Sequence, residues 1–275
     1  MRDHSLTQGI TEADVAVTTS HSANDDLIRH AQTVAGELGC PFSERSDDSL
    51  DVIRDSTGRQ HLIILTRYEV RLVTPTDTFQ FHPNMAARRI EAMMRGEADR
   101  FANFMDLKPG DRLLDATCGL GSDAIVAAHT VGDRGRVLAV ERSTVLGALV
   151  CHGLKTYRHR TAEVVSAMRR VEVVTADAAE TLKSQADRSW DVVTFDPMFE
   201  ETVTLSHGLD VVKMLAWPGS TTPEQVAEAS RVAKRCVGMK DRSPGNKLRN
   251  LGFASGVVPV SVPKNGNVYY GRIDV

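Results

Sequence analysis

Residues 113–123 have the residue types and the spacing of a ligand-binding loop. They read LLDATCGLGSD: an apolar run ends at Asp115, and a turn with Gly119 and Gly121 leads into a helix. Glycine lacks a Cβ, so the backbone can turn tightly there and approach a ligand closely. The first turn of the helix adds unpaired N–H groups. We therefore expect a nucleotide or nucleoside to bind here; a plain strand–helix turn is the alternative.

The acidic residue before the turn narrows the choice of ligand. Dinucleotide enzymes carry a third glycine here and bind a pyrophosphate at the helix start. In this chain the third glycine is absent, and the Asp115 carboxylate would repel a phosphate but bind an ammonium group. S-adenosylmethionine carries an amino acid moiety, a sulfonium and no phosphate, so the loop favours it over a nicotinamide cofactor. The loop residues expected to contact it are Asp115, Thr117, Gly119, Gly121 and Asp123, and Asp123 could instead cap the helix.

Acidic residues also end the next two expected strands. Glu141 follows the glycine loop at about the ~20-residue spacing at which an acidic residue accepts from ribose hydroxyls. Its alternative is a solvated glutamate paired with Arg142. Asp177 is placed to accept from an adenine amine while the N–H of Ala178 meets a ring nitrogen. Asp177 is also a good N-cap for the helix expected at 178–185, and the two roles are compatible.

The second segment that could do chemistry, residues 192–200, reads VVTFDPMFE. Asp196 and Pro197 should lie at the carboxyl edge of the sheet, where ligands bind in open α/β folds. The Asp196 carboxylate and the Pro197 carbonyl can both accept from an exocyclic NH₂, which would orient the nitrogen lone pair toward a methyl donor. Phe199 can stack on a base. We predict these three residues to be catalytic; a strand-ending turn with Phe199 in the core is the alternative.

Alternating strands and helices must position these segments. Strand–helix alternation with right-handed crossovers gives a doubly wound, mostly parallel sheet. Two further strands after Asn250 should form an antiparallel hairpin at the sheet edge. The expected strands are 112–115, 136–141, 171–176, 191–196 and 235–240, and the expected helices are 122–129, 144–158, 178–185 and 222–232.

A small α+β unit is expected before this sheet, over residues 15–83, after a disordered lead at 1–14. The helical pattern of 84–107, divided at Gly96, begins the main domain at 84–275. Within the small unit we expect a strand at 15–19, a helix from Asn24 or Asp25 to Leu38, a short helix at 49–54, strands at 61–66 and 70–74, and a third strand with Phe79 and Phe81.

The order of DATCGLGSD, VERS, ADA and DPMF resembles that of class I S-adenosylmethionine-dependent methyltransferases. DPMF is similar to the segment of RsmJ-type 16S ribosomal RNA guanine-N2 methyltransferases and their uncharacterised relatives. FHPNMAARRI and VGMKDRSP extend the resemblance over residues 81–275. It implies a Rossmann-like methyltransferase sheet, with Asp196 near the methyl-transfer centre and in contact with the cofactor. It further implies cofactor contacts by Asp115, Gly119, Gly121, Asp123, Glu141, Arg142 and Asp177.

An RNA substrate would need cations for its phosphates. We expect Arg158/Arg160 and Arg169/Arg170 to be solvated helix faces, and the other candidates are Arg88, Arg89, Lys155, Lys247 and Arg249. Lys240 and Arg242 should instead lie at the active-site edge. His82 and Asn84 lie at the junction of the two parts, and His82 is equally well a structural histidine. The predicted substrate-binding residues are His82, Asn84, Arg88, Lys240 and Arg242.

The predicted function is N-methylation of an exocyclic guanine amine in ribosomal RNA. Glu200 and Glu201 follow DPMF where the family usually has proline, and with the net charge they support a protein or small-molecule acceptor as an alternative. An inactive cofactor-binding protein is a third hypothesis, and Asp115, Glu141, Asp177 and Asp196 argue against it. A dehydrogenase is disfavoured by the missing glycine.

Composition sets broad limits on the protein. Its 275 residues are 41% hydrophobic and 25% charged, as in ordinary globular proteins, and the net charge of −3 does not suit a general polyanion binder. No apolar run approaches the ~18 residues of a membrane span and no secretory signal is seen, so we expect a cytoplasmic protein. The four cysteines form no metal pattern and should be buried free thiols; no metal is expected, and the oligomeric state stays open.

Overall fold

The computed structural model describes residues 9–197, 207–216, 219–242, 245–253, 258–261 and 267–275. Phe199, predicted to be catalytic, lies outside these residues, as do Glu200 and Glu201. The contacts divide the chain into two compact units: unit 1 is 1–82, 143–158 and 204–217, and unit 2 is 83–142, 159–203 and 218–275. The expected disordered lead falls mainly on undescribed residues, although Glu12–Asp14 forms a short 3-10 helix.

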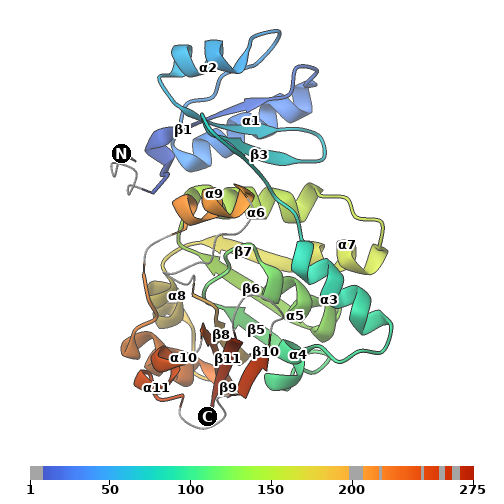
Figure 1. The fold of residues 1–275 in the computed structure, drawn as a ribbon, viewed down its shortest axis with the longest axis vertical. Coiled ribbons are helices and arrows are strands. Elements are labelled where there is room, and N and C mark those ends of the chain that lie inside the picture. The colour runs from blue at the N-terminus through green and yellow to red at the C-terminus, as the bar shows by residue number, and fades with distance from the viewer. Residues whose placement is uncertain (1–8, 198–206, 217–218, 243–244, 254–257, 262–266) are drawn as a thin grey trace. The chain divides into compact units, whose positions relative to one another are not determined.

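Unit 1 is built on a four-stranded sheet in the order β1-β2-β3-β4 (Figure 1). β1 and β2 pair in parallel, and the other neighbours pair antiparallel. Asn24 caps the first helix by accepting from the N–H of Leu27, and Gly39 ends it with a left-handed φ of 65°. The strands are β1 (Val15–Thr19), β2 (His61–Leu65), β3 (Val70–Val73) and β4 (Thr78–Gln80), and the helices are α1 (Asp25–Leu38), α2 (Leu50–Thr57), α6 (Thr144–Thr156) and α9 (His207–Leu215).

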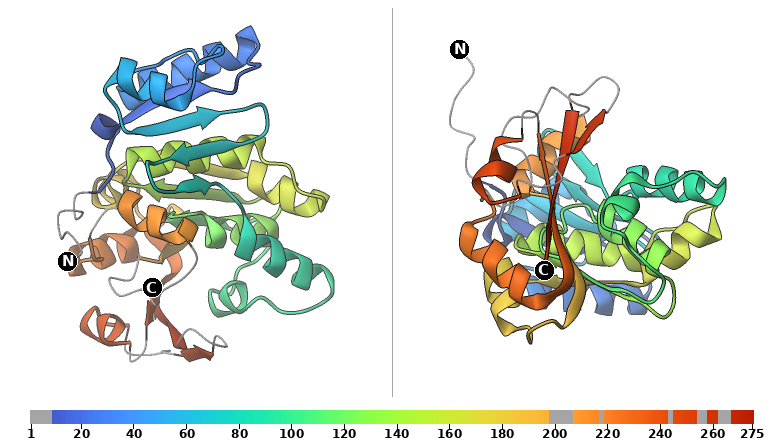
Figure 2. Two further views of the ribbon diagram at one scale, coloured as in Figure 1. Left: turned by 45° about the horizontal axis from the view of Figure 1, so that its top comes forward. Right: turned by 90° about the horizontal axis from the view of Figure 1, so that it is seen from below.

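Unit 2 contains the doubly wound sheet, as the strand–helix alternation predicts. Its seven strands lie in the order β10-β11-β9-β8-β5-β6-β7. The strands from β5 to β9 pair in parallel, whereas β11 is antiparallel to both β9 and β10 (Figure 2). The strands are β5 (Arg112–Asp115), β6 (Arg136–Glu141), β7 (Val171–Thr175), β8 (Trp190–Phe195), β9 (Ala233–Arg242), β10 (Val258–Ser261) and β11 (Asn267–Asp274).

Helices cover both faces of this sheet. α3, α4, α5 and α7 pack with one another on one face, and α8, α10 and α11 lie on the other (Figure 1). The core between the sheet and the second layer contains Trp190, Phe195 and Phe253, each at most 2% exposed. The helices are α3 (Asn84–Met94), α4 (Arg100–Phe104), α5 (Ser122–Val131), α7 (Ala162–Arg169), α8 (Ala178–Ser184), α10 (Pro223–Val232) and α11 (Asn246–Asn250).

Three of the observed helices were not expected from the sequence: α7, α9 and α11. α6 also ends at Thr156 rather than at residue 158, because Tyr157 leaves the helical conformation with ψ at 135°. β9 extends two residues beyond the expected end, through its pairing with β11. α11 has only five residues and α7 only eight, and such short segments give a weak periodic signal.

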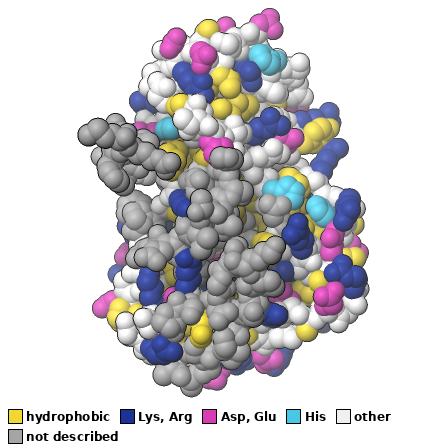
Figure 3. All heavy atoms as spheres, viewed as in Figure 1, with side chains coloured by type: hydrophobic (Ala, Val, Ile, Leu, Met, Phe, Trp, Pro, Cys, Tyr) yellow, Lys and Arg dark blue, Asp and Glu magenta, His cyan; other side chains and the backbone are white. Residues whose placement is uncertain are grey.

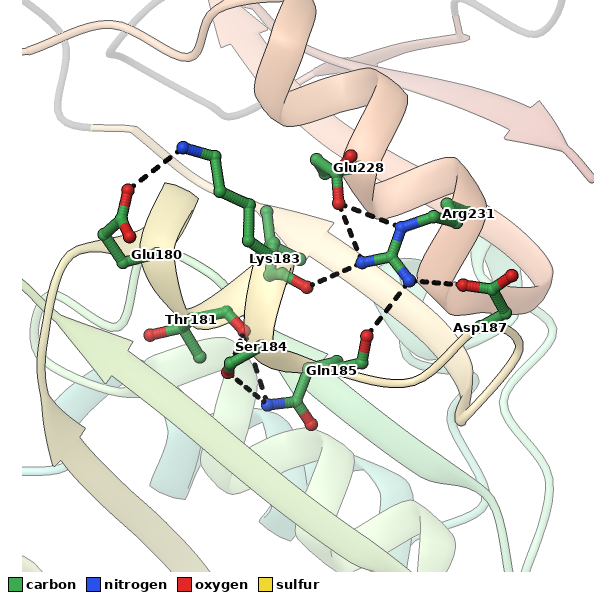
Figure 4. A network of polar contacts seen from close by, with 9 residues as sticks. Glu180, Thr181, Lys183, Ser184, Gln185, Asp187, Glu228 and Arg231 are labelled. Atoms are coloured by element: carbon green, nitrogen blue, oxygen red, sulfur yellow. Dashed lines mark hydrogen bonds and ion pairs between the residues drawn. The ribbon is translucent and has the colours of Figure 1, made fainter.

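Arg231 of α10 fixes the end of α8 (Figure 4). Its guanidinium donates to the backbone oxygens of Leu182 and Gln185, at 3.1 and 3.0 Å. It also pairs with Glu228 at 2.7 Å and Asp187 at 2.5 Å. Carbonyls at a helix C-terminus lack partners within the helix, so these bonds satisfy them and anchor α8.

Two further findings on the described residues concern the cysteines and the length and apolar character of the helices. Cys118 and Cys236 are buried, Cys40 and Cys151 are partly buried, and all four are free thiols. Within the described ranges, no helix combines the length and the apolar character needed to span a bilayer.

Candidate functional site

The acidic residues singled out in the sequence meet at the carboxyl edge of the large sheet. Asp115 ends β5, Glu141 ends β6, and Asp196 directly follows β8. Asp177 lies two residues beyond β7. Because β5 pairs in parallel with both β6 and β8, these strand ends must lie side by side. The sequence therefore predicted this grouping correctly.

The glycine turn is closed by two of these carboxylates. Gly119 and Gly121 have φ values of 51° and 74°, the left-handed region that favours glycine. One oxygen of Asp115 accepts from the N–H of Thr117 at 3.1 Å, and one oxygen of Glu141 accepts from the N–H of Gly119 at 2.9 Å. The carboxylates thus stabilise the turn that its glycines permit.

Glu141 is 7% exposed, so it is not the solvated glutamate of the alternative. Arg142 forms an ion pair with Asp177 at 3.0 Å. Asp177 also caps α8, accepting from the N–H groups of Ala179 and Glu180 at 2.8 and 3.3 Å. The capping role considered for Asp177 is therefore confirmed. Its contact with an adenine stays a prediction.

Asp115 is a buried carboxylate whose pKa is raised. It is 3% exposed, and burial raises the pKa of its carboxyl to about 7. The N–H of Thr117 works against this rise, while the charges of Asp123 and Asp196 add to it. The charge of Lys240 also opposes the rise, but burial outweighs both opposing effects.

Asp123 does not cap α5. The N-cap is Gly121, and the side chain of Asp123 turns instead to two cations. Its oxygens bind Arg89 at 2.7 Å and Lys240 at 2.5 Å. Arg89 also donates twice to Asp99, at 2.8 and 2.9 Å. Because Lys240 and Arg89 overcome the effect of burial, the pKa of Asp123 lies below its usual value.

Lys240 joins this group to Asp196. Its ammonium lies 2.8 Å from the carboxylate of Asp196, and its side chain is 14% exposed. The backbone N–H of Asp196 donates to the hydroxyl of Thr117 at 2.5 Å. Burial raises the pKa of Asp196, although Lys240 opposes the rise. Asp196 is therefore held by both the glycine loop and β9.

The other substrate candidates belong to α3, to the end of β9 and to the segment before α3. Arg88 is exposed on α3, and Arg242 is partly buried at the end of β9. His82 is exposed and packs edge-on against the Tyr157 ring, with centroids 5.0 Å apart. Asn84 begins α3, and its side chain is outside the described set. On the face shown in Figure 3, the described Lys and Arg side chains are mixed with Asp and Glu rather than gathered in one broad basic area.

Two further expectations about cations need correction. Arg89 was a candidate for phosphate contact, but its partners are buried carboxylates. Arg158 and Arg160 are exposed as expected but follow the end of α6 and do not lie on a helix face, and Arg170 is partly buried. Arg158 stacks over Tyr68 at 3.7 Å, Arg160 pairs with Glu91, and Arg170 binds Asp133 and the oxygen of Ala128.

A cavity of about 510 Å³ opens beside Asp196 and Lys240. Its wall combines apolar side chains from α3, α4 and β11 with the ion-paired residues described above. No sequence signal indicated it, because α3 and β11 lie more than 170 residues apart along the chain. In the described part of the chain no group of His, Cys, Asp and Glu is arranged to hold a metal ion.

Comparisons with known proteins agree on one family. Residues 60–213 match the model of a family described as putative SAM-dependent methyltransferases. The uncharacterized protein YpiP of Bacillus subtilis is 34% identical over 238 residues, which cover 86% of this chain and 92% of that protein. Ribosomal RNA small subunit methyltransferase J of Laribacter hongkongensis is 40% identical over 121 residues, which span 42% of this chain and 41% of that relative.

The fold has a solved counterpart. A SAM-dependent methyltransferase from Neisseria gonorrhoeae superimposes with a TM-score of 0.54 over 94% of this chain and 95% of that one. At 17% sequence identity, this likeness concerns the fold alone.

Proposed function

The chain belongs to the family of putative SAM-dependent methyltransferases, and from that premise we propose that it methylates the exocyclic amine of a guanine in ribosomal RNA. The similarity to ribosomal RNA small subunit methyltransferase J supports an RNA acceptor, over less than half of that relative's length. Ribosomal RNA as substrate would also place the protein in the cytoplasm.

The cofactor is S-adenosylmethionine, and the chemistry of the carboxyl edge fits it. The under-compensated carboxylate of Asp115 suits the ammonium of the amino acid moiety. Glu141, at the next strand end, would accept from the ribose hydroxyls. Asp177 and the N–H of Ala178 would hold the adenine, although the Asp177 side chain already caps α8. The side chain of Asp123 is committed to Arg89 and Lys240, so its contribution to the cofactor would be indirect.

One observation carries the proposed reaction: the position of Asp196. Its backbone is fixed by Thr117 of the cofactor loop, while its carboxylate lines the cavity beside that loop. An acceptor amine bonded to Asp196 would thus lie next to the cofactor site. Such positioning supplies much of the rate of a two-substrate reaction.

The residues of the chain would orient the amine and take up its charge. When bound, the cofactor supplies an electrophilic methyl group on its sulfonium. Hydrogen bonds from the amine to the Asp196 carboxylate and the Pro197 carbonyl would hold the nitrogen lone pair in line for transfer of that methyl group. The nitrogen becomes positive in this step, and a nearby carboxylate stabilises it. Since burial raises the pKa of Asp196, that carboxyl is suited to receive the proton that the nitrogen then loses.

Replacement of Asp196 tests the proposal. We expect Asp196→Ala to lower the rate of methyl transfer to RNA by about 100- to 1,000-fold, the size of effect seen when one transition-state contact is removed. Its affinity for S-adenosylmethionine, measured by calorimetry, should change only a few-fold. Asp187→Ala is the matched control, because Asp187 is also an ion-paired aspartate but belongs to the α8–α10 network. Undiminished transfer by Asp196→Ala would exclude the mechanism.

A further inference from the structure

The 510 Å³ cavity is separate from the strand ends assigned to the cofactor. Asp196, Lys240 and Ser122 line it, but Asp115, Gly119, Glu141 and Asp177 do not. Its volume lies within the range of about 300–1,000 Å³ typical of small-molecule sites. The cavity therefore meets the cofactor site at Asp196, where the acceptor must be presented.

The apolar part of the wall suits a flat ring. It includes Met85 and Met93 of α3, Phe101 of α4 and Tyr270 of β11. Phe101 and Tyr270 flank the Lys240 ammonium, which lies 5.8 and 5.7 Å from their ring centroids. Aromatic rings and thioethers pack well against the faces of a planar, polarizable ligand.

The positive and negative charges on the cavity wall are equal in number. Three carboxylates face three cations among the lining residues: Glu97, Asp99 and Asp196 against Arg89, Arg100 and Lys240. Arg89 with Asp99 and Lys240 with Asp196 are direct ion pairs. A ligand with a net charge of either sign would have to compete with these pairs, whereas a neutral ligand can add hydrogen bonds to them. The balance therefore favours a neutral acceptor over a free phosphate or a cationic side chain.

The polar edge of the cavity offers an acceptor beside a donor. One oxygen of Asp196 binds Lys240, and the carboxylate has a second oxygen. The Lys240 ammonium has three N–H donors, and the described contacts to Asp123 and Asp196 use two of them. Guanine presents the complementary edge, with the 2-amino group and N1–H as donors and O6 as an acceptor. Asp196 would bind the two donors, and Lys240 would lie on the O6 side.

We propose that this cavity receives the acceptor guanine, turned out of its stack in the RNA, with Lys240 as the residue that selects for O6. Turning a base out into an enclosed pocket is how enzymes reach base atoms that stacking hides. The inference rests on the proposed function, because it names the pocket in which that reaction takes place. It goes further in assigning α3, α4 and β11 to substrate binding.

Two methionines of α3 provide a matched test. Met85 lines the cavity and is 56% exposed, whereas Met94 is 49% exposed and is not among the lining residues. Met85→Trp should fill part of the cavity without disturbing the core, and Met94→Trp adds the same side chain elsewhere. The probe is total ribosomal RNA from a strain that lacks the gene, with labelled S-adenosylmethionine. We expect Met85→Trp to raise KM for RNA at least about 10-fold with unchanged cofactor affinity, and Met94→Trp to behave as wild type.

Recognition of the guanine O6 by Lys240 is tested with a synthetic RNA. This RNA contains the guanine that wild type methylates in total ribosomal RNA. Substituting 2-aminopurine for the target guanine keeps the amine but removes N1–H and the O6 acceptor. Wild type should prefer guanine by at least about 10-fold in kcat/KM, and Lys240→Met should reduce that preference at least several-fold. 6-Thioguanine, which retains N1–H, isolates the O6 contact and should show the same trend.

The outcomes separate this inference from the proposed function. If Met85→Trp weakens cofactor binding instead, the cavity belongs to the cofactor and the pocket assignment fails. If Met85→Trp leaves RNA methylation unchanged, the base binds elsewhere. If Lys240→Met stays folded and keeps the guanine preference, the role of Lys240 fails while the pocket stands. The proposed function itself would be defeated if wild type left no N2-methylguanosine in ribosomal RNA.

Discussion

The negative charges of two groups of carboxylates at one edge of the large sheet are stabilised in different ways. The loop carboxylates, Asp115 and Glu141, accept from backbone N–H groups of the glycine turn. The paired carboxylates, Asp99, Asp123 and Asp196, are bound by Arg89 and Lys240. The described contacts thus hold the first group by backbone N–H groups and the second by side-chain cations.

This difference separates the two substrates of a methyl transfer. Under the proposed function, the loop carboxylates would serve S-adenosylmethionine, Asp115 through its ammonium and Glu141 through its ribose hydroxyls. A neutral amine suits the paired carboxylates, where a positive charge appears only during the reaction. If this division is correct, variants on the two sides should fail in different ways.

The largest effect on stability is expected from Arg89→Met. Asp99 and Asp123 are each 6% exposed at the side chain, and loss of Arg89 would leave both buried charges poorly compensated. Removing one partner of a buried ion pair costs about 3–5 kcal/mol. Chemical denaturation should show this loss, whereas Arg95→Met, which breaks a pair exposed by more than 60% on both sides, should cost less than about 1 kcal/mol.

The pH dependence of the protein's stability makes that prediction more specific. Burial would raise the pKa of Asp99, but the hydrogen bonds and the charge of Arg89 hold it below its usual value. The stability contributed by Asp99 is therefore present above the unfolded pKa of about 4 and is lost as the pH falls through the folded value. Equal stability of Arg89→Met and wild type at neutral pH would contradict the buried pairing.

A smaller effect, on cofactor affinity, is expected from Asp115→Asn. An ionic hydrogen bond is worth about 1.5–3 kcal/mol, so the dissociation constant for S-adenosylmethionine should rise roughly 10- to 150-fold. Because the pKa of Asp115 is raised to about 7, the ammonium must bind the ionised form, and wild-type affinity should increase from pH 6 to pH 7.5. Calorimetry of the Asp115→Asn variant should show a flat profile over the same range.

The stability of the protein without cofactor should change with pH in the opposite sense to the cofactor affinity. A carboxyl with a raised pKa contributes stability below its unfolded value of about 4, and that stability is lost as the pH rises through about 7. Asp115→Asn should remove this loss. A wild-type affinity independent of pH would show that Asp115 does not bind the ammonium.

The sequence predicted what depends on local pattern and strand order. The ends of β5, β6 and β8 could be placed because an apolar run followed by a polar residue marks the carboxyl edge of a parallel sheet. The N-cap role of Asp177 followed from its position before α8. The C-terminal hairpin followed from two short β-like runs at the end of the chain.

What the sequence could not predict depends on residues far apart along it. Arg89 and Asp123 are separated by 34 residues, and Lys240 and Asp196 by 44. A charged residue on a helix is usually solvated, so Arg89 gave no sign that its partners would be buried. Lys240 was expected at its strand end and at the active-site edge, but no local pattern indicated that β9 continues to Arg242 in its pairing with β11 or that Lys240 binds Asp123.

The most direct measurement of the central claim is the destination of the methyl group. Purified protein would be incubated with labelled S-adenosylmethionine and extract from cells lacking the gene, and the products digested with nuclease or protease. The account predicts label that nuclease releases, recovered by mass spectrometry as N2-methylguanosine. Label that survives nuclease but not protease, or that appears in another nucleoside, would contradict it.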